Sequence, residues 1–233
     1  MVLLIGIVFM LIGMYVSWRL KSKFEEYSQT PLASGMSGKE IAEAMLRDHQ
    51  LYDVKVISVE GHLTDHYNPV DKTVNLSPEV YYGRNAAAAA VAAHECGHAV
   101  QHATAYAMLE FRSAMVPVVQ VSSTVLQYIN MALLFGAGYL FYTKGTGDVL
   151  LLLLIGLNAI ITLFALVTLP VEFDASKRAL EWIYNKRIVN SSELAMSKDA
   201  LKWAALTYVV SAMGALANLA YYVMIFLNRR NDD

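Results

Sequence analysis

The sequence contains one short motif whose residue types and spacing suit metal-assisted hydrolysis. His94, Glu95 and His98 form an H-E-x-x-H pattern. In an α-helix, positions four residues apart differ by only about 40° around the axis, so both imidazoles can bind one metal ion. Glu95 lies beside this pair, where it can act as a general base on a water molecule without binding the metal. The motif predicts a catalytic zinc site with His94 and His98 as ligands.

Four nearby residues are expected to have other roles. Cys96 points about 200° away from His94 around the helix axis, which indicates a small buried packing residue. Gly97 lowers helix stability by about 1 kcal/mol relative to alanine, so we expect another element to pack closely against it. His102 lies about 12 Å beyond His94, too far for a shared ion, which indicates an interfacial histidine. Glu110 is predicted on the same helix, four turns beyond the motif, and is therefore also too far away to bind the same ion.

A catalytic zinc ion needs a third protein ligand and one open position. Glu172 follows Pro170 closely, at the end of an apolar stretch and at the start of a predicted helix over 171–184. We therefore predict Glu172 as the third ligand, with Glu181 and Asp174 as alternatives. Asp174 is better suited to accept a hydrogen bond from a ligand.

The residues that precede the motif predict a small α+β unit. Ser37 and Glu40 form a capping box that begins a helix over 39–49. Three runs with strand-like composition follow, at 54–59, 62–66 and 72–76. The last two are separated by a turn that contains proline, and together the runs predict a short β-meander.

Two further helix starts lead to the motif. Pro78 stands at the first position of a short helix that ends near Gly83. Asn85 can cap the next helix, which carries the motif and is rich in alanine over 86–93. The alanines could reflect helix propensity alone, or close packing against a membrane helix.

The composition indicates a membrane protein. Of 233 residues, 56% are hydrophobic and only 16% are charged, and the mean hydropathy is +0.40. Soluble domains have about 25% charged residues. Four stretches lack Asp, Glu, Lys and Arg and approach or exceed the length that crosses a bilayer as a helix: 2–18, 116–142, 149–169 and 204–227. The stretch 116–142 carries a polar stripe, so it could instead be a buried core helix that does not cross the membrane.

The distribution of positive charge orients these spans. Segments 19–115 and 170–203 contain 15 of the 18 Lys and Arg residues, so the positive-inside rule places both in the cytoplasm and both termini outside. The predicted organisation is a transmembrane anchor (1–18), a cytoplasmic domain with the motif (19–115), two transmembrane helices (116–169), a cytoplasmic helix with the third ligand (170–203), and a C-terminal transmembrane helix and tail (204–233).

Charge and cysteine content disfavour two other classes of function. The net charge of −2 and the pI near 6.3 give no basic surface for nucleic acid, so we expect no such partner. The single cysteine, Cys96, excludes an intrachain disulfide and a zinc site built from cysteines.

These residues resemble a family of integral membrane proteins, the neutral zinc metallopeptidases. The resemblance is carried by H-E-C-G-H-A-V-Q at 94–101, E-F-D-A-S at 172–176 and A-A-L-T-Y-V at 204–209, with support from 65–69 and 72–82. More distantly, the chain is similar to heat-shock membrane proteases and CAAX prenyl proteases, gluzincins whose third ligand is the glutamate of an E-x-x-x-D motif. Here the last position of that motif is Ser176, and Asp174 is the acid that could replace it.

The residues and the resemblance together imply a mainly α-helical integral membrane protein with a small α+β zincin-like domain. We expect a multi-pass zinc metalloendopeptidase of the cell membrane, with Zn²⁺ as cofactor, that cleaves membrane or membrane-proximal proteins at the cytoplasmic face. Its partners would be a protein or peptide substrate and membrane lipid. The alternatives are a non-catalytic membrane partner or chaperone-like protein with a structural zinc, and a hydrolase of non-peptide amides or esters. An intact Glu95 favours an enzyme, because a structural site does not need a base.

Substrate binding and transition-state stabilisation need further groups. An additional hydrogen-bond donor is normally required for the oxyanion, and His66, Tyr67 and Tyr184 are candidates. The strand predicted at 72–76 is expected to bind an extended substrate by β-addition.

Overall fold

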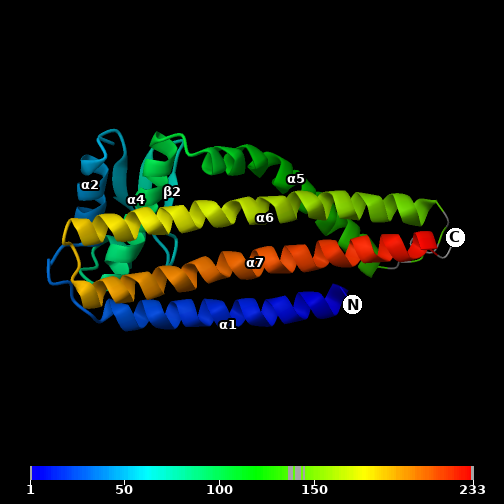
Figure 1. The fold of residues 1–233 in the computed structure, drawn as a ribbon, viewed down its shortest axis with the longest axis horizontal. Helices are drawn as coiled ribbons and strands as arrows, with labels where there is room; N and C mark the ends of the chain where they lie inside the picture. The colour runs from blue at the N-terminus through cyan, green and yellow to red at the C-terminus, as the bar shows by residue number, and fades with distance from the viewer. Residues whose placement is uncertain (1, 136–138, 140–142, 144, 232–233) are drawn as a thin grey trace. The chain divides into compact units, whose positions relative to one another are not determined.

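The structure, a computed structural model, describes residues 2–135, 139, 143 and 145–231. Part of the predicted stretch 116–142 lies outside these residues. Along the described chain (Figure 1) the elements are α1 (Val2–Ser28), α2 (Gly38–Asp48), β1 (Lys55–Ser58), β2 (His66–Asn68), β3 (Thr73–Leu76), α3 (Pro78–Tyr81), α4 (Ala86–Ala103), α5 (Ala107–Leu134), α6 (Thr146–Asn185) and α7 (Ser191–Asn231).

The chain divides into two compact units. Unit 1 comprises residues 1–13, 111–168 and 208–233. It contains most of α5 and the apolar parts of α1, α6 and α7. Unit 2 comprises residues 14–110 and 169–207, and therefore contains the sheet, α2, α3 and α4, together with the more polar ends of the long helices.

Three helices are long and apolar enough to cross a membrane, by length and composition: α1 over Leu4–Ser28, α6, and α7 over Ser191–Arg229. The stretch predicted at 116–142 corresponds largely to α5, which is not among these three in the part of the chain that the structure describes. Its glutamines, serines, threonine and asparagine lower its hydropathy. The count of four spans therefore stays a prediction.

Helix α4, which carries the motif, lies in the core of unit 2. Its alanines at 86–90, 92 and 93 are at most 1% exposed, and α2 packs against α4. The Ser197 hydroxyl of α7 also donates a hydrogen bond to the Ala86 carbonyl at 3.2 Å. Alanine side chains permit this close approach of neighbouring backbones, so the alanine run serves packing as well as helix propensity.

The predicted β-meander is wrong. The strand order is β1-β3-β2, in which β1 pairs with β3 in parallel and β2 pairs with β3 antiparallel. The turn between β2 and β3 is where it was predicted, but the chain after β1 crosses over, with positive φ angles at Gly61 and Leu63, so that β3 inserts between the other two strands. Because β3 is hydrogen-bonded on both sides, the substrate-binding role predicted for 72–76 is also wrong.

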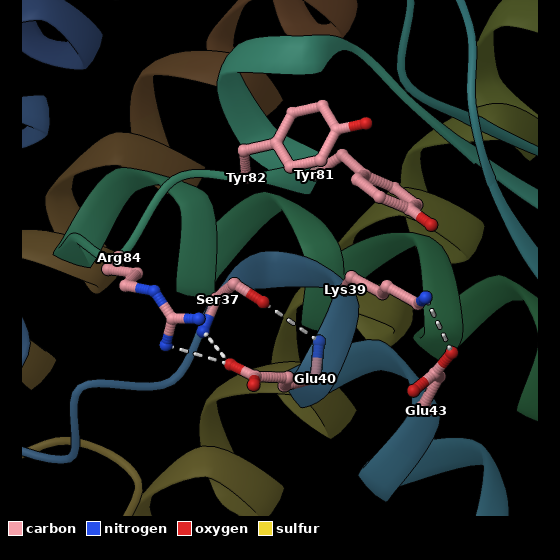
Figure 2. Close-up of a pocket in the computed structure, with 7 residues that line it drawn as sticks. All are labelled: Ser37, Lys39, Glu40, Glu43, Tyr81, Tyr82 and Arg84. Atoms are coloured by element: carbon pink, nitrogen blue, oxygen red, sulfur yellow. Dashed lines mark hydrogen bonds and ion pairs between the residues drawn. The ribbon is translucent and has the colours of Figure 1, made fainter.

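Three helices begin where the sequence predicted. Ser37 and Glu40 form the predicted capping box at the wall of a surface pocket (Figure 2), with both reciprocal hydrogen bonds present. Pro78 begins α3. The Asn85 side chain accepts a hydrogen bond from the backbone N–H of Ala88 at 2.9 Å and so caps α4.

Two helix boundaries differ from the prediction. Helix α6 does not begin at 171 but continues through Pro170. Proline removes one backbone hydrogen bond, yet Val167 and Val171 on either side are buried, so packing can offset that loss and let the helix continue. Helix α4 ends at Ala103, and Ala105 adopts a φ of 50°. Glu110 consequently lies on α5 rather than on the motif helix.

The cap of α4 can be tested by mutation. Asn85→Ala should lower the midpoint of thermal unfolding of the detergent-solubilised protein by about 2–4 °C, because an N-cap contributes about 1 kcal/mol. Asn85→Asp keeps a side-chain acceptor and should change the midpoint much less. Equal midpoints for Asn85→Ala and the wild type would contradict the assigned role of the cap.

Candidate metal centre

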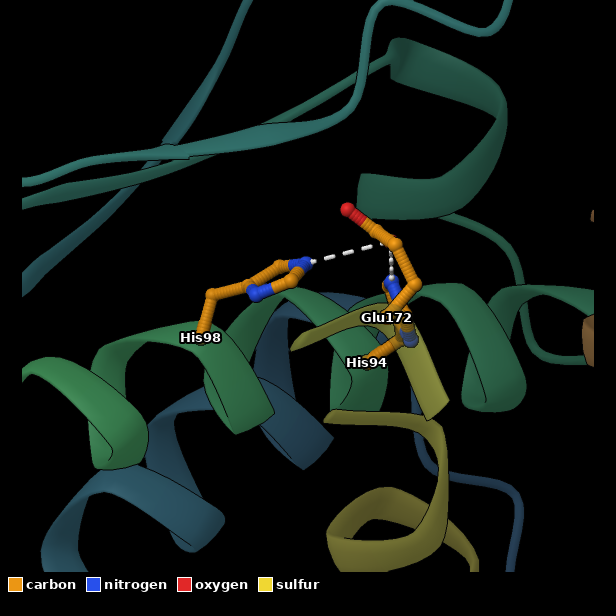
Figure 3. A group of neighbouring side chains, drawn as sticks. All are labelled: His94, His98 and Glu172. Carbon is orange, nitrogen blue, oxygen red and sulfur yellow. Dashed lines mark ion pairs between the residues drawn. The ribbon is translucent and has the colours of Figure 1, made fainter. Parts of the chain in front are cut away.

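His94, His98 and Glu172 converge on one point in unit 2 (Figure 3). One ligand atom of each residue lies within 4.8 Å of the others. Glu172 Oε2 is 3.4 Å from His94 Nε2 and 3.6 Å from His98 Nε2. Two ligands bound to one zinc ion in tetrahedral geometry, each at about 2.0–2.1 Å, are about 3.4 Å apart. The donor set and its spacing therefore fit a zinc ion with three protein ligands and one open position.

Two helices supply these side chains. His94 and His98 lie on successive turns of α4, and Glu172 lies on α6, three residues beyond the apolar stretch 149–169. The side chains of His94 and His98 are 13% and 12% exposed, and that of Glu172 is 4% exposed. Because little solvent screens these groups, their mutual interactions are stronger than at a surface.

The electrostatics of the cluster favour a cation at its centre. Burial alone would raise the pKa of Glu172, but hydrogen bonds from His94 and His98 outweigh it and hold that pKa well below its usual range. Burial opposes protonation of His98, yet Glu172 and Glu95 raise the pKa of His98 above its ordinary value. A site that retains a proton in this way also favours a divalent cation, which competes with the proton for the same nitrogen.

Gln101 fixes which nitrogen of His98 faces Glu172. The amide of Gln101 is fully buried, and its Nε2 donates hydrogen bonds to the Val171 carbonyl and the Asp174 carboxylate, both at 2.8 Å. Since both partners can only accept, the amide nitrogen must face them, and Oε1 must face His98 Nδ1 at 3.0 Å. Nδ1 of His98 therefore carries a proton, which leaves Nε2 as the potential ligand atom.

Ser176 is the corresponding partner of His94. Its hydroxyl oxygen lies 3.1 Å from His94 Nδ1. The sequence left open whether Asp174 or Ser176 takes the position of the final acid in E-x-x-x-D. In the structure Ser176 contacts His94 directly, while Asp174 reaches His98 through Gln101. A hydroxyl can both donate and accept, so Ser176 orients His94 without imposing a tautomer.

Gly97 allows α4 and α6 to approach closely enough for these contacts. A Cβ atom at this position would lie 2.6 Å from the Ala175 carbonyl oxygen and 3.1 Å from the Ala175 Cα. The close packing that the sequence predicted for Gly97 is confirmed, and the packing element is the segment of α6 between Glu172 and Ser176. Any larger residue here would require one of the two backbones to move.

Glu95 is buried beside the two histidines. Its charge acts on a second carboxylate, Asp65, the residue directly before β2. Burial and the charge of Glu95 raise the pKa of Asp65, against hydrogen bonds that Asp65 accepts from the backbone N–H and hydroxyl of Ser77 at 2.7 and 3.1 Å. The charge of Glu95 therefore acts on a second, partly buried carboxyl group near α4.

The other residues considered from the sequence lie outside the cluster. Glu181 is exposed and pairs with Lys177 at 3.8 Å. His102 Nδ1 lies 3.0 Å from the Tyr67 hydroxyl, at the surface. Cys96 is fully buried, as predicted. None of these side chains belongs to the three-residue group that could hold a metal among the described residues.

Sequence reasoning assigned no role to Gln101 or Asp65. A signal for Gln101 was available, because it follows His98 by three positions and therefore lies on the same face of α4. Asp65 had no such signal, since its approach to Glu95 depends on the crossover between β1 and β2.

Comparisons with known proteins agree with this geometry. A family profile described as "Putative neutral zinc metallopeptidase" matches residues 2–227. A protein of Bacillus subtilis (strain 168), named "Putative membrane protease YugP", is 41% identical over 226 residues, which are 95% of this chain and 95% of that protein. No solved structure matches the chain.

The contact at Gly97 predicts a steric effect on the site. Gly97→Ala should weaken zinc binding and lower the thermal midpoint, because the added methyl group forces α6 away from α4. Gly156→Ala, on α6, is the control for adding a methyl group to a helical glycine, since a Cβ there meets nothing within 4 Å. Isothermal titration with zinc and thermal unfolding provide both readouts. If Gly97→Ala binds zinc as tightly as Gly156→Ala, the close approach is not needed for the site.

The partners of the two histidines predict graded effects on zinc affinity. Gln101→Ala should weaken zinc binding about 10–100-fold, because His98 loses the group that fixes its tautomer. Ser176→Ala should weaken it less, and Ser176→Asp should retain it, since a carboxylate accepts the same hydrogen bond. Glu181→Gln, exposed on α6, should leave the affinity unchanged. A Gln101→Ala variant with wild-type affinity would contradict the role given to Gln101.

Proposed function

The chain belongs to the family described as "Putative neutral zinc metallopeptidase", and on this premise we propose that it is a membrane zinc metalloendopeptidase. Its reaction is the hydrolysis of peptide bonds in membrane or membrane-proximal proteins at the cytoplasmic face. The observation that carries the proposal is the convergence of His94, His98 and Glu172, with ligand atoms within 4.8 Å of one another and Glu95 next to them in sequence. This set combines three neutral or anionic ligands with a separate base.

The proposed ligands are His94, His98 and Glu172, and zinc bound to them would supply Lewis-acid activation of a water molecule and of the scissile carbonyl. Glu95 accepts the proton of the attacking water and donates it to the leaving amine. Gln101 and Ser176 hold the two imidazoles in place through their Nδ1 atoms. Burial of Glu172 limits competing water around the carboxylate.

Strand β2 is proposed as the substrate-binding edge. It is an outer strand of the sheet, and its Tyr67 contacts His102 at the end of the motif helix. An extended peptide added to this edge would gain main-chain hydrogen bonds, which depend little on sequence. Such binding predicts a broad sequence preference.

Tyr67 is the proposed donor to the oxyanion among the three candidates. It extends from β2 to α4, where its hydroxyl meets His102. His66 instead engages the Thr64 carbonyl through Nδ1 at 2.7 Å and is exposed, and Tyr184 is exposed on α6, more than three turns beyond Glu172. Tyr67 therefore has the more direct connection to the motif helix.

The proposed topology has four spans, both termini outside, and the polar segments 19–115 and 170–203 in the cytoplasm. Its support is the bias of Lys and Arg toward these two segments. Arg229, one of the few basic residues on the outer side, pairs with Asp148 at 3.5 Å. This pairing reduces the positive charge that would otherwise oppose an external C-terminus.

The function is tested by zinc content and peptidase activity measured together. The detergent-purified wild type should contain about one zinc ion per chain, as expected for a single three-ligand site. Glu172→Ala should lose the zinc and the activity. Glu95→Gln should keep the zinc and lose activity on a fluorogenic peptide library by about 10²–10⁴-fold, because only the base is removed.

Three other outcomes would contradict the proposed function or the proposed ligands. Wild-type zinc with no difference in activity between the wild type and Glu95→Gln would favour a non-catalytic protein with a structural zinc. Zinc retained in Glu172→Ala would mean that another residue is the third ligand. Hydrolysis of lipid-linked amides or esters in place of peptides, in a parallel substrate screen, would favour a non-peptide substrate.

A further inference from the structure

Arg19 lies in an aromatic cluster that the proposed reaction does not use. Its guanidinium carbon is 5.9 Å from the ring centre of Trp18 and 5.1 Å from that of Trp203. The ring of Tyr15 joins the cluster, with its centre 6.0 Å from Trp18 and 6.4 Å from Trp203. Two helices, α1 and α7, thus bring three aromatic rings around one cationic side chain within unit 2.

The guanidinium of Arg19 has no anionic partner among the residues that the structure describes. Within the described parts of the chain no carboxylate lies at ion-pair distance, and Nε is buried without a hydrogen-bond partner. Two acids of the same helices are engaged elsewhere: Asp199 accepts from the Tyr27 hydroxyl at 2.8 Å, and Glu26 pairs with Lys23 at 2.7 Å. Aromatic rings interact with a cation through their faces, and they do not satisfy the N–H donors of the guanidinium.

The sequence around the cluster indicates that the cluster lies at the level of the lipid headgroups. In α1 the uncharged stretch 2–18 ends at Trp18, and Arg19 is the first charged residue after it. In α7 the uncharged stretch 204–227 begins directly after Trp203. Contacts between Tyr15, Arg19 and Trp203 bring these two boundaries together. Tryptophan is enriched at membrane–water interfaces, where the abundant anion is the lipid phosphate.

We propose that Arg19, held between Trp18 and Trp203, binds the phosphate group of an anionic lipid. The guanidinium edge can bind two phosphate oxygens at once, and the indole rings contact the glycerol and the upper acyl chains. Lys202, exposed and next to Trp203 in sequence, favours a lipid with net negative charge. The inference rests on the membrane location of α1 and α7 in the proposed topology, but not on peptidase activity.

The test measures lipid binding to the full chain in non-ionic detergent by native mass spectrometry. Dioctanoyl phosphatidylglycerol carries the phosphate and the acyl chains, dioctanoylglycerol carries the chains alone, and inorganic phosphate carries the anion alone. The wild type should bind the first more tightly than either of the other two. Arg19→Ala should weaken binding of phosphatidylglycerol at least about tenfold, because a charge-assisted pair is lost. Arg19→Lys should weaken it by a smaller factor.

Lys21→Ala is the matched control, since Lys21 is exposed, two positions away and on another face of α1. It should change the affinity less than about twofold, as expected for one exposed charge. The proposal is overturned by equal affinity of wild type and Arg19→Ala, by an equal loss in Lys21→Ala, by equal binding of dioctanoylglycerol, or by displacement of phosphatidylglycerol by inorganic phosphate. Release of the chain from native membranes by alkaline carbonate would instead contradict the topology itself.

Discussion

The close approach of α4 and α6 at Gly97 is the constraint on which the candidate site depends. The missing side chain at this position lets the backbone of Ala175 lie against α4. Ala175 stands between Glu172 and Ser176 on α6, so the same approach brings Glu172 to the imidazole Nε2 atoms and Ser176 to His94. A site whose ligands come from two helices needs their separation to be fixed within a few tenths of an ångström, and a backbone contact is less adjustable than a contact between flexible side chains.

Buried polar contacts complete this arrangement. Gln101 binds His98 on its own helix and the Val171 carbonyl and Asp174 on the other. It therefore connects His98, a potential ligand, to the backbone of the residue directly before Glu172. A buried amide must satisfy both its oxygen and its nitrogen, and here only one orientation does so. The same three hydrogen bonds thus link α4 to α6 and place a proton on Nδ1 of His98.

The long helices extend from the apolar stretches into unit 2 without a break. Helix α6 continues through Pro170, so the stretch 149–169 and Glu172 belong to one continuous helix. The three helices that are long and apolar enough to cross a membrane all contribute residues to unit 2. Arg19 and its two tryptophans lie where the uncharged stretch of α1 ends and the uncharged stretch of α7 begins.

The sequence by itself determined the features that depend on neighbours within about one helical turn. The H-E-x-x-H motif, the capping box at Ser37, the cap at Asn85 and the need for close packing at Gly97 all follow from local geometry and propensity. The choice of Glu172 also came from the sequence, through its place at the end of an apolar stretch, and the structure brings it next to His94 and His98.

Only the tertiary structure decided the strand order, the continuity of α6 through Pro170, the end of α4 before Glu110, and the separate roles of Ser176 and Gln101. These features depend on which distant surfaces bury one another. A local sequence pattern cannot specify that choice.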